Sequence, residues 1–223
     1  LRGAGMRKSR LSFLLRGLAA VAAVLVHLPV ASAGGDAVRG LDRWLSGTRD
    51  LECRFEQRLV SSALGGAARE SGVLYVERPG RLRWDYREPE RKIVLVDGGR
   101  TVLYVVEDRQ WIRGRLSEEQ GLLPMLLAGR GSVADLFEAS EATDETGEGR
   151  PRVRLVRRGA PGEFEEIVLT LSPGDHAIER ADVLDGAGNR VEYRFSALKR
   201  NRGIDPAVFA IEPPAGVEVL GEP

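Results

Sequence analysis

Apolar and polar residues alternate over most of the chain, and this period of two predicts β-strands rather than helices. The clearest stretch is Arg81–Tyr86, which follows a turn that contains Pro79 and Gly80. One face of this predicted strand carries three large apolar residues: Leu82, Trp84 and Tyr86. Such a face either fills a core or lines a cavity. The alternation alone leaves both interpretations open.

The same alternation recurs along the chain, interrupted by short turns rich in glycine, proline and aspartate. It predicts further strands over Leu51–Leu59, Ser71–Glu77, Lys92–Asp97, Thr101–Glu107, Arg152–Arg157, Glu163–Leu171, Ala177–Leu184 and Arg190–Leu198. Turns such as Asp97-Gly98-Gly99 are typical of hairpins, in which consecutive strands pair in antiparallel fashion. We therefore expect one long, curved antiparallel sheet.

A few segments depart from this rhythm and predict helices. Asp36–Leu45 places apolar residues at spacings of three and four, as an amphipathic helix does. Leu122–Ala128 is a dense apolar run behind a possible capping box of Ser117 and Gln120, and 132–137 predicts a further short helix. A short helix that is apolar all round is either buried or covers something removable. With the sheet, these helices indicate an α+β fold.

Residues 1–33 have the composition of a secretory signal peptide. Basic residues precede the apolar run Gly17–Val30, and Ala31-Ser32-Ala33 offers a cleavage site. The strongly apolar part of the run is short for a membrane span, so a retained anchor is the weaker interpretation. Cleavage would leave Gly34 first, without the cysteine that a lipoprotein needs for acylation. We expect a single domain over residues 34–223, exported to the periplasm.

Charge and composition exclude several classes of function. Five of the 33 basic residues lie in the leader, whereas all 33 acidic residues follow it, so the mature chain is mildly acidic and unsuited to nucleic acid. The single cysteine, Cys53, alternates with apolar residues and should be buried. His176, the one histidine after the leader, has neither a nucleophile-elbow sequence nor enough cysteine for a common zinc site. We expect no enzyme, no metal and no cofactor.

An ordered series of short motifs resembles the LolA family, the periplasmic carriers of outer-membrane lipoproteins. The resemblance covers nearly the whole mature chain, and the order of the motifs is more specific than any one of them. The motifs are Arg54–Gln57, Gly72–Pro79, Leu82–Trp84, Val96–Gly98, Pro124–Ala128, Asp205–Phe209 and Pro213–Val217.

The resemblance implies an incomplete, unclosed antiparallel β-barrel whose apolar cavity is covered by a helical lid. The lid would be the segment Leu122–Ala128. Arg78, which matches the family's Arg-Pro motif, would be the latch that hydrogen-bonds the lid backbone and keeps the cavity closed; otherwise it is an ordinary exposed hairpin arginine. Five residues would line the cavity or, alternatively, belong to a plain core: Leu82, Trp84, Tyr86, Met125 and Leu126.

The resemblance also implies a function. A monomeric carrier of this family would take acylated lipoproteins from an inner-membrane LolCDE-type transporter and deliver them to the outer-membrane receptor LolB or an equivalent. Each buried methylene is worth about 0.8 kcal/mol, so acyl chains need an apolar shelter to cross water. Two alternatives remain: a module of the same fold that binds another lipid or senses lipoproteins, and an unrecognised hydrolase.

Overall fold

The computed structural model describes residues 35–60, 67–115, 122–129, 132–144, 147–158, 164–185 and 189–221. Gly34–Pro223 forms one compact unit, and everything that follows concerns it. The proposed signal peptide and the capping box of Ser117 and Gln120 lie outside the described residues and stay predictions. Within the described residues, no helix is both long enough and apolar enough to span a bilayer.

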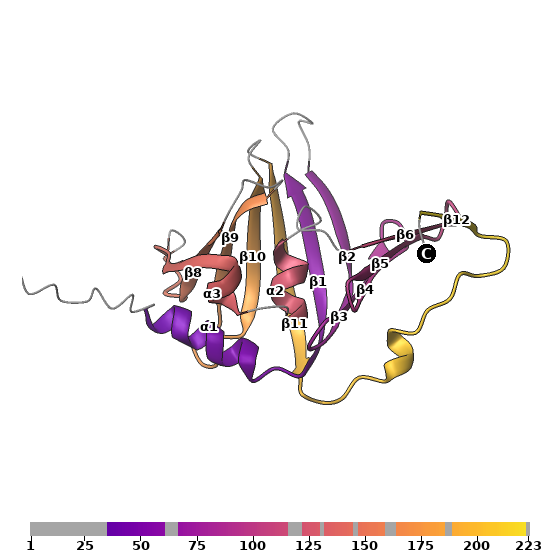
Figure 1. Ribbon diagram of the computed structural model, residues 1–223. Coiled ribbons are helices and arrows are strands. Elements are labelled where there is room, and N and C mark those ends of the chain that lie inside the picture. The colour runs from indigo at the N-terminus through magenta and orange to yellow at the C-terminus, as the bar shows by residue number, and fades with distance from the viewer. Residues whose placement is uncertain are drawn as a thin grey trace, which may run out of the picture. The chain divides into compact units, whose positions relative to one another are not determined.

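The described strands form one sheet, in the order β12-β6-β5-β4-β3-β2-β1-β11-β10-β9-β8-β7 (Figure 1). Their bounds are β1 Asp50–Val60, β2 Ala67–Glu77, β3 Arg81–Glu88, β4 Lys92–Asp97, β5 Arg100–Val105, β6 Gln110–Arg115, β7 Phe137–Glu141, β8 Arg152–Arg157, β9 Phe164–Leu171, β10 Ile178–Asp185, β11 Arg190–Arg200 and β12 Glu218–Leu220. All neighbours pair antiparallel except β12 with β6. The pairing of β1 with β11 joins the two halves of the meander.

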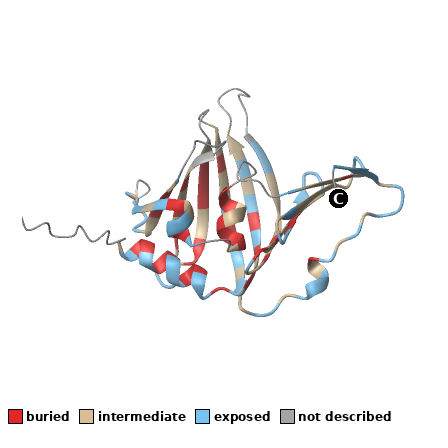
Figure 2. Cartoon of the chain, in the orientation of Figure 1, coloured by how far each residue is buried: buried red, intermediate tan, exposed pale blue. Residues whose placement is uncertain are grey.

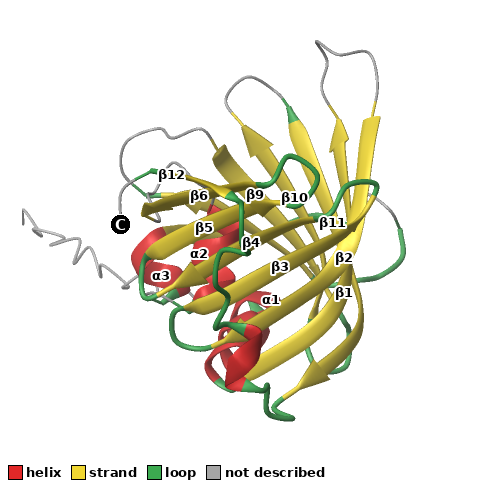
Figure 3. Cartoon of the chain, turned by 90° about the vertical axis from the view of Figure 1, so that its right-hand side faces the viewer, coloured by secondary structure: helices red, strands yellow, loops and turns green. Residues whose placement is uncertain are grey.

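The sheet curves around its helices without closing, because β12 and β7 lie at opposite ends of the strand order. Figure 3 shows the helices within the curve of the sheet. They are α1 Asp36–Ser46, α2 Leu122–Ala128 and α3 Val133–Leu136. Helix α1 packs against β7 and β8, whereas α2 contacts β2, β3 and β9. The expected α+β fold with an incomplete antiparallel barrel is therefore confirmed.

The two faces of the sheet differ in the way that the alternation predicts. On the concave face, alternate positions of each strand are buried, as Cys53 and Phe55 are on β1 and as Ile167 and Leu169 are on β9. Less buried residues take the positions between them, such as Arg54 on β1 and Val168 on β9, and Figure 2 shows buried and less buried positions alternating along the strands. Burial raises the pKa of the Cys53 thiol to about 12, with a smaller contribution from Glu52. Cys53 is thus a structural thiol, as the sequence indicates.

Four described elements were not expected from the sequence: the strands β6, β7 and β12 and a short 3-10 helix, η2, which spans Pro206–Val208. Strand β6 follows the expected strand Thr101–Glu107, and Phe137 begins β7 instead of ending a helix. The residues of β12 are all exposed. Both β7 and β12 lie at sheet edges, where only one side needs a partner. Their sequences are short and lack a long alternating run, so the periodicity gives no strand signal.

Candidate functional site

A cavity of about 270 Å³ lies between α2 and the concave face of β3–β6. Pro124 of the helix forms one side of it. The opposite side is the apolar surface of the sheet, formed by Leu82, Val94, Val96, Leu103 and Ile112. Val94, Leu103 and Ile112 are only partly buried, whereas Leu82 and Val96 are almost fully buried. The cavity therefore begins in the core and opens along β4–β6.

The register of four consecutive strands creates this surface. Leu82 pairs with Val96 across β3 and β4, and Val94 pairs with Leu103 of β5. Leu103 pairs in turn with Ile112 of β6. Directly paired residues project from the same face of a sheet, so the apolar side chains form one continuous patch. Helix α2 packs mainly against β2, β3 and β9, so it covers β5 and β6 less. The part of the patch on β5 and β6 is therefore open.

An aromatic cluster borders the cavity on the same face. Its members come from β1, β3 and β11: Phe55, Trp84, Tyr86, Tyr193 and Phe195. Phe55 meets Trp84 edge to face, with ring centroids 4.7 Å apart, and meets Tyr86 in the same way at 4.9 Å. Such pairs contribute about 0.5–1.5 kcal/mol beyond area burial. The cluster is a rigid end wall for the apolar surface.

Polar groups mark the end of the apolar surface beyond the aromatic cluster. The Tyr86 hydroxyl donates to Gln57 Oε1 at 2.9 Å, and Gln57 Nε2 donates to Glu70 at 3.1 Å. Lys92 donates to the other oxygen of Glu70, and its ammonium lies 4.4 Å from the centroid of the Tyr86 ring. Burial raises the pKa of Tyr86, and the nearby Tyr193 and Glu70 raise it further. Tyr86 therefore stays a neutral hydrogen-bond donor.

Arg78 lies in the turn between β2 and β3, against the C-terminal end of α2. Its guanidinium occupies the space beside Gly129, where a Cβ atom would collide with it. Gly129 has a φ of +73°, so glycine suits both the backbone and the contact. The neighbouring Gly80 N–H donates to the Ala128 carbonyl at 2.7 Å. The turn between β2 and β3 is thus joined to the C-terminal end of α2 by one backbone hydrogen bond and by the packing of Arg78.

The Arg78 side chain is only partly satisfied in this position. Its Nη1 atom is buried and has no hydrogen-bond partner. Burial lowers the pKa of the guanidinium below its ordinary value. The last carbonyls of a helix lack partners within the helix and carry partial negative charge, so a cation at this end is favourable. Among the described residues, Arg78 therefore meets the end of α2 through packing and charge.

The residues expected to line a cavity fall into three groups. Leu82 lines it, whereas Trp84 and Tyr86 lie beside it in the aromatic cluster. On α2, Leu126 is buried and Met125 is partly exposed. Sequence reasoning missed five apolar lining residues: Val94, Val96, Leu103, Ile112 and Pro124. Cross-strand register was the missing signal, because the alternation of each strand does not say which faces combine.

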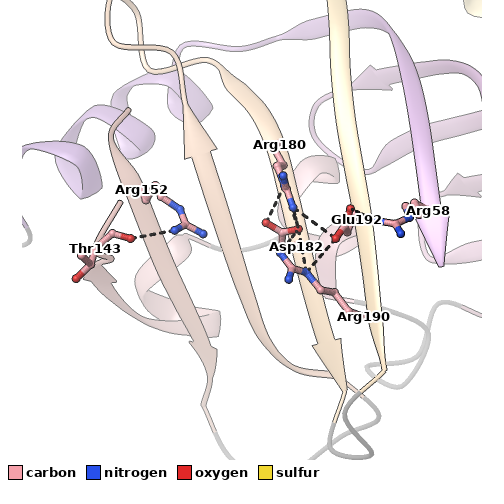
Figure 4. A network of polar contacts seen from close by, with 7 residues as sticks. All are labelled: Arg58, Thr143, Arg152, Arg180, Asp182, Arg190 and Glu192. Carbon is pink, nitrogen blue, oxygen red and sulfur yellow. Dashed lines mark hydrogen bonds and ion pairs between the residues drawn. The ribbon is translucent and has the colours of Figure 1, made fainter. Parts of the chain in front are cut away.

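The outer face of the sheet is charged where the concave face is apolar. Figure 4 shows a network of side chains on β10, β11 and β1. Arg180 holds Asp182, which is 2% exposed, through bonds of 2.8 to 3.1 Å, and Arg190 approaches the same carboxylate at 3.0 Å. Glu192 lies 3.6 Å from Arg58 of β1. This part of the outer face is thus built from paired charges, in contrast to the apolar concave face.

Comparisons with known proteins place these observations in context. Residues 46–212 match the family model described as outer membrane lipoprotein carrier protein LolA. The outer-membrane lipoprotein carrier protein of Alkalilimnicola ehrlichii is 31% identical over 214 residues, covering 96% of this chain and 96% of the relative. The corresponding protein of Dechloromonas aromatica is 30% identical over 196 residues, covering 87% of this chain and 92% of the relative.

A similar fold occurs among solved structures. An uncharacterized conserved protein from Thermus thermophilus superposes with a TM-score of 0.50 at 11% sequence identity. The match covers 82% of this chain and 96% of that structure. At this identity the likeness concerns the fold alone.

Proposed function

Because the chain belongs to the LolA family of outer membrane lipoprotein carriers, we propose that it binds acylated lipoproteins with their acyl chains between α2 and β3–β6. One observation carries this proposal: the cavity of about 270 Å³ is apolar and opens along β4–β6. A chain that enters from this side meets Ile112 and Leu103 first and the buried Leu82 last. Each methylene that leaves water there contributes about 0.8 kcal/mol.

We further propose that the carrier works in the periplasm and passes its cargo between membranes. It would receive lipoproteins from a LolCDE-type transporter and hand them to LolB or an equivalent receptor. Two findings support a shuttle of this kind: the family match, and an apolar cavity beside α2 that is open along β4–β6. The residues that would line the site are Leu82, Trp84, Tyr86, Met125 and Leu126, together with Val94, Val96, Leu103, Ile112 and Pro124.

The cargo can be identified directly. We would purify the mature protein from the periplasm under native conditions and analyse the bound molecules by mass spectrometry. The proposal predicts acylated lipoprotein. A free lipid would instead select the alternative of a carrier or sensor with another cargo. Protein that carries neither, even when acylated lipoprotein is added in excess, would contradict both.

Arg78 is proposed to stabilise the closed position of α2. In the Arg78→Leu variant, an apolar side chain replaces the donors that face the helix end. We expect the amide hydrogens of Leu122–Gly129 to exchange about tenfold faster than in the unchanged protein. A buried interaction with a charged donor stabilises the folded state by about 1.5–3 kcal/mol, and a partly exposed one, as here, stabilises it by less. Hydrogen exchange followed by mass spectrometry measures this, and release of a labelled lipoprotein should change with it.

A matched control is available on the neighbouring strand. Arg87 is exposed and makes no ion pair or hydrogen bond among the described residues, so Arg87→Leu should leave the exchange of α2 unchanged. Equal exchange rates in the two variants, or unchanged lipoprotein release from Arg78→Leu, would remove Arg78 from the closing mechanism.

A further inference from the structure

A second groove, of about 620 Å³, lies on the outer face of β5 and β6, on the other side of the sheet from the cavity. The chain segment that leads from η2 to β12 passes over it and contributes Ile211, Glu212 and Pro213. Figure 1 shows this segment as the yellow stretch of chain that runs outside β4–β6. The floor of the groove includes Arg100, Val102, Trp111, Arg113 and Arg115.

Three guanidinium groups meet in this groove. Arg100 of β5 and Arg115 of β6 are directly paired in the sheet, and Arg113 lies on the same face of β6. Like charges that face each other across two strands destabilise a sheet. Yet among the described residues none of the three guanidinium groups forms a hydrogen bond or an ion pair. Two carboxylates are near them, that of Asp97, which pairs with Arg100 in the sheet, and that of Glu212 in the groove lining, and neither is bonded to a guanidinium group. Among the described residues that line the groove, three guanidinium groups thus meet one carboxylate, and the net charge is positive.

Trp111 adds an unsatisfied donor to the same groove. Its side chain is 3% exposed, and its indole Nε1 is buried without a hydrogen-bond partner. Indole can only donate, so the missing partner is an acceptor. Buried polar groups without partners are rare in folded proteins and call for an explanation. Val102 and Ile211 line the groove beside the arginines, so its surface is both cationic and apolar, with the buried indole beneath it.

We propose that this groove binds an extended acidic peptide segment of a partner protein, with carboxylates at alternate positions. Arg113 and Arg115 are separated by one residue on an extended strand, which places them about 6.7 Å apart along it. Two carboxylates with one residue between them have the same spacing in an extended peptide. Guanidinium groups bind carboxylates through paired, charge-assisted hydrogen bonds.

The shape of the groove favours a peptide over a membrane surface. Ile211 and Pro213 stand over the floor, and Trp111 is almost inaccessible from outside. A flat layer of lipid headgroups cannot reach that floor, whereas a single extended chain can lie along it. An apolar residue between the two acidic ones would point away from the arginines and toward Ile211.

Four residues border both the groove and the cavity: Thr101, Val102, Arg113 and Gly114. The register of the sheet shows on which face the side chains of Val102 and Arg113 lie. These two residues pair with each other across β5 and β6, and through Leu95 of β4 they align with Arg83 of β3. The Arg83 guanidinium donates to the carbonyl of Val208, in η2, at 2.8 Å. Since η2 belongs to the segment outside the sheet, this row of side chains lies on the outer face.

The groove and the cavity thus use opposite faces of the same two strands. Ile112 faces the cavity and its neighbour Arg113 faces the groove, as Leu103 and Val102 do on β5. Occupation of the groove therefore leaves the cavity free. A partner protein bound there could hold the carrier while acyl chains enter or leave.

The test uses a short blocked peptide of alternating glutamate and valine, titrated into the full mature protein by calorimetry. We expect binding that weakens as salt is added, because part of each guanidinium is exposed. The triple variant Arg100→Gln, Arg113→Gln, Arg115→Gln should bind the peptide at least about tenfold more weakly. The same peptide with glutamine in place of glutamate should not bind.

Three other outer-face arginines provide the matched control. Arg54, Arg69 and Arg194 are exposed and make no ion pair among the described residues, so changing all three to glutamine removes the same charge elsewhere. This control variant should keep its affinity for the peptide. Equal losses in the two triple variants, or binding of phosphatidylglycerol vesicles through the groove arginines in place of the peptide, would overturn the proposal.

The outcome is independent of the carrier function. The groove variant should bind acyl chains as the unchanged protein does, because Leu103 and Ile112 are untouched. Loss of peptide binding with acyl binding intact in the groove variant supports the proposal. If the unchanged protein binds acyl chains but not the peptide, the proposal of peptide binding in the groove is wrong, and the proposed carrier function is unaffected.

Discussion

The Phe55→Ala variant is expected to lose about 3–5 kcal/mol of unfolding free energy. Phe55 is 1% exposed and lies between Trp84 and Tyr86, which it meets edge to face. It also packs against Gly72 on β2, where added atoms would have no room. Removal of the ring would leave a cavity in the centre of the concave face and break both aromatic contacts. Denaturant unfolding followed by circular dichroism measures the loss.

The neighbouring position on the same strand provides the control. Arg54 is exposed on the outer face and makes no ion pair among the described residues, so Arg54→Ala should change the unfolding free energy by less than about 0.5 kcal/mol. A loss in Phe55→Ala no larger than that of this control would mean that the aromatic cluster is not part of the core. In that case the end wall of the cavity would be wrongly placed.

The Ile112→Trp variant is expected to bind acyl chains at least about tenfold more weakly while it keeps its fold. Ile112 is partly buried and lines the cavity on β6, so an indole there would occupy space that an acyl chain needs. A tenfold loss of affinity corresponds to about 1.4 kcal/mol of binding free energy, which is less than two buried methylenes contribute. Displacement of a fluorescent fatty acid measures the affinity, and thermal unfolding checks the fold.

Val102→Trp is the matched control, because Val102 lies on β5 with its side chain on the outer face. The added indole then projects away from the cavity, and acyl affinity should stay within about twofold of the unchanged protein, a difference of a few tenths of a kcal/mol. Equal acyl affinity in Ile112→Trp and the unchanged protein would place the cargo elsewhere.

Much of the fold could be predicted from the sequence because most strands alternate and their turns are chemically distinct. The pairing of β2 with β3 and of β4 with β5 follows from the turns at Pro79-Gly80 and Gly98-Gly99. The edge strands β7 and β12, and β6 beside β12, were not found in this way. Strand β12 has only exposed residues and is held by parallel pairing with β6, a long-range contact that leaves no periodicity.

The candidate site was only partly predictable. Alternation placed Leu82, Trp84 and Tyr86 on one face, but it could not distinguish the cavity from the aromatic wall beside it. That distinction depends on cross-strand neighbours from β1 and β11, as the contacts of the Trp84 ring show. The contact between Arg78 and Gly129 joins residues that are far apart in the sequence, so no local sequence pattern predicts it.

The central claim is that acyl chains lie against the concave face of β3–β6. The most direct test places a photo-crosslinking amino acid at Leu103 in one variant and at Val102 in another, in cells that are exporting lipoproteins. Adjacent positions on β5 then report on opposite faces of the sheet. The account predicts crosslinks to lipoprotein acyl chains from position 103 and none from position 102. Acyl crosslinks from position 102 alone, or equally from both, would contradict it.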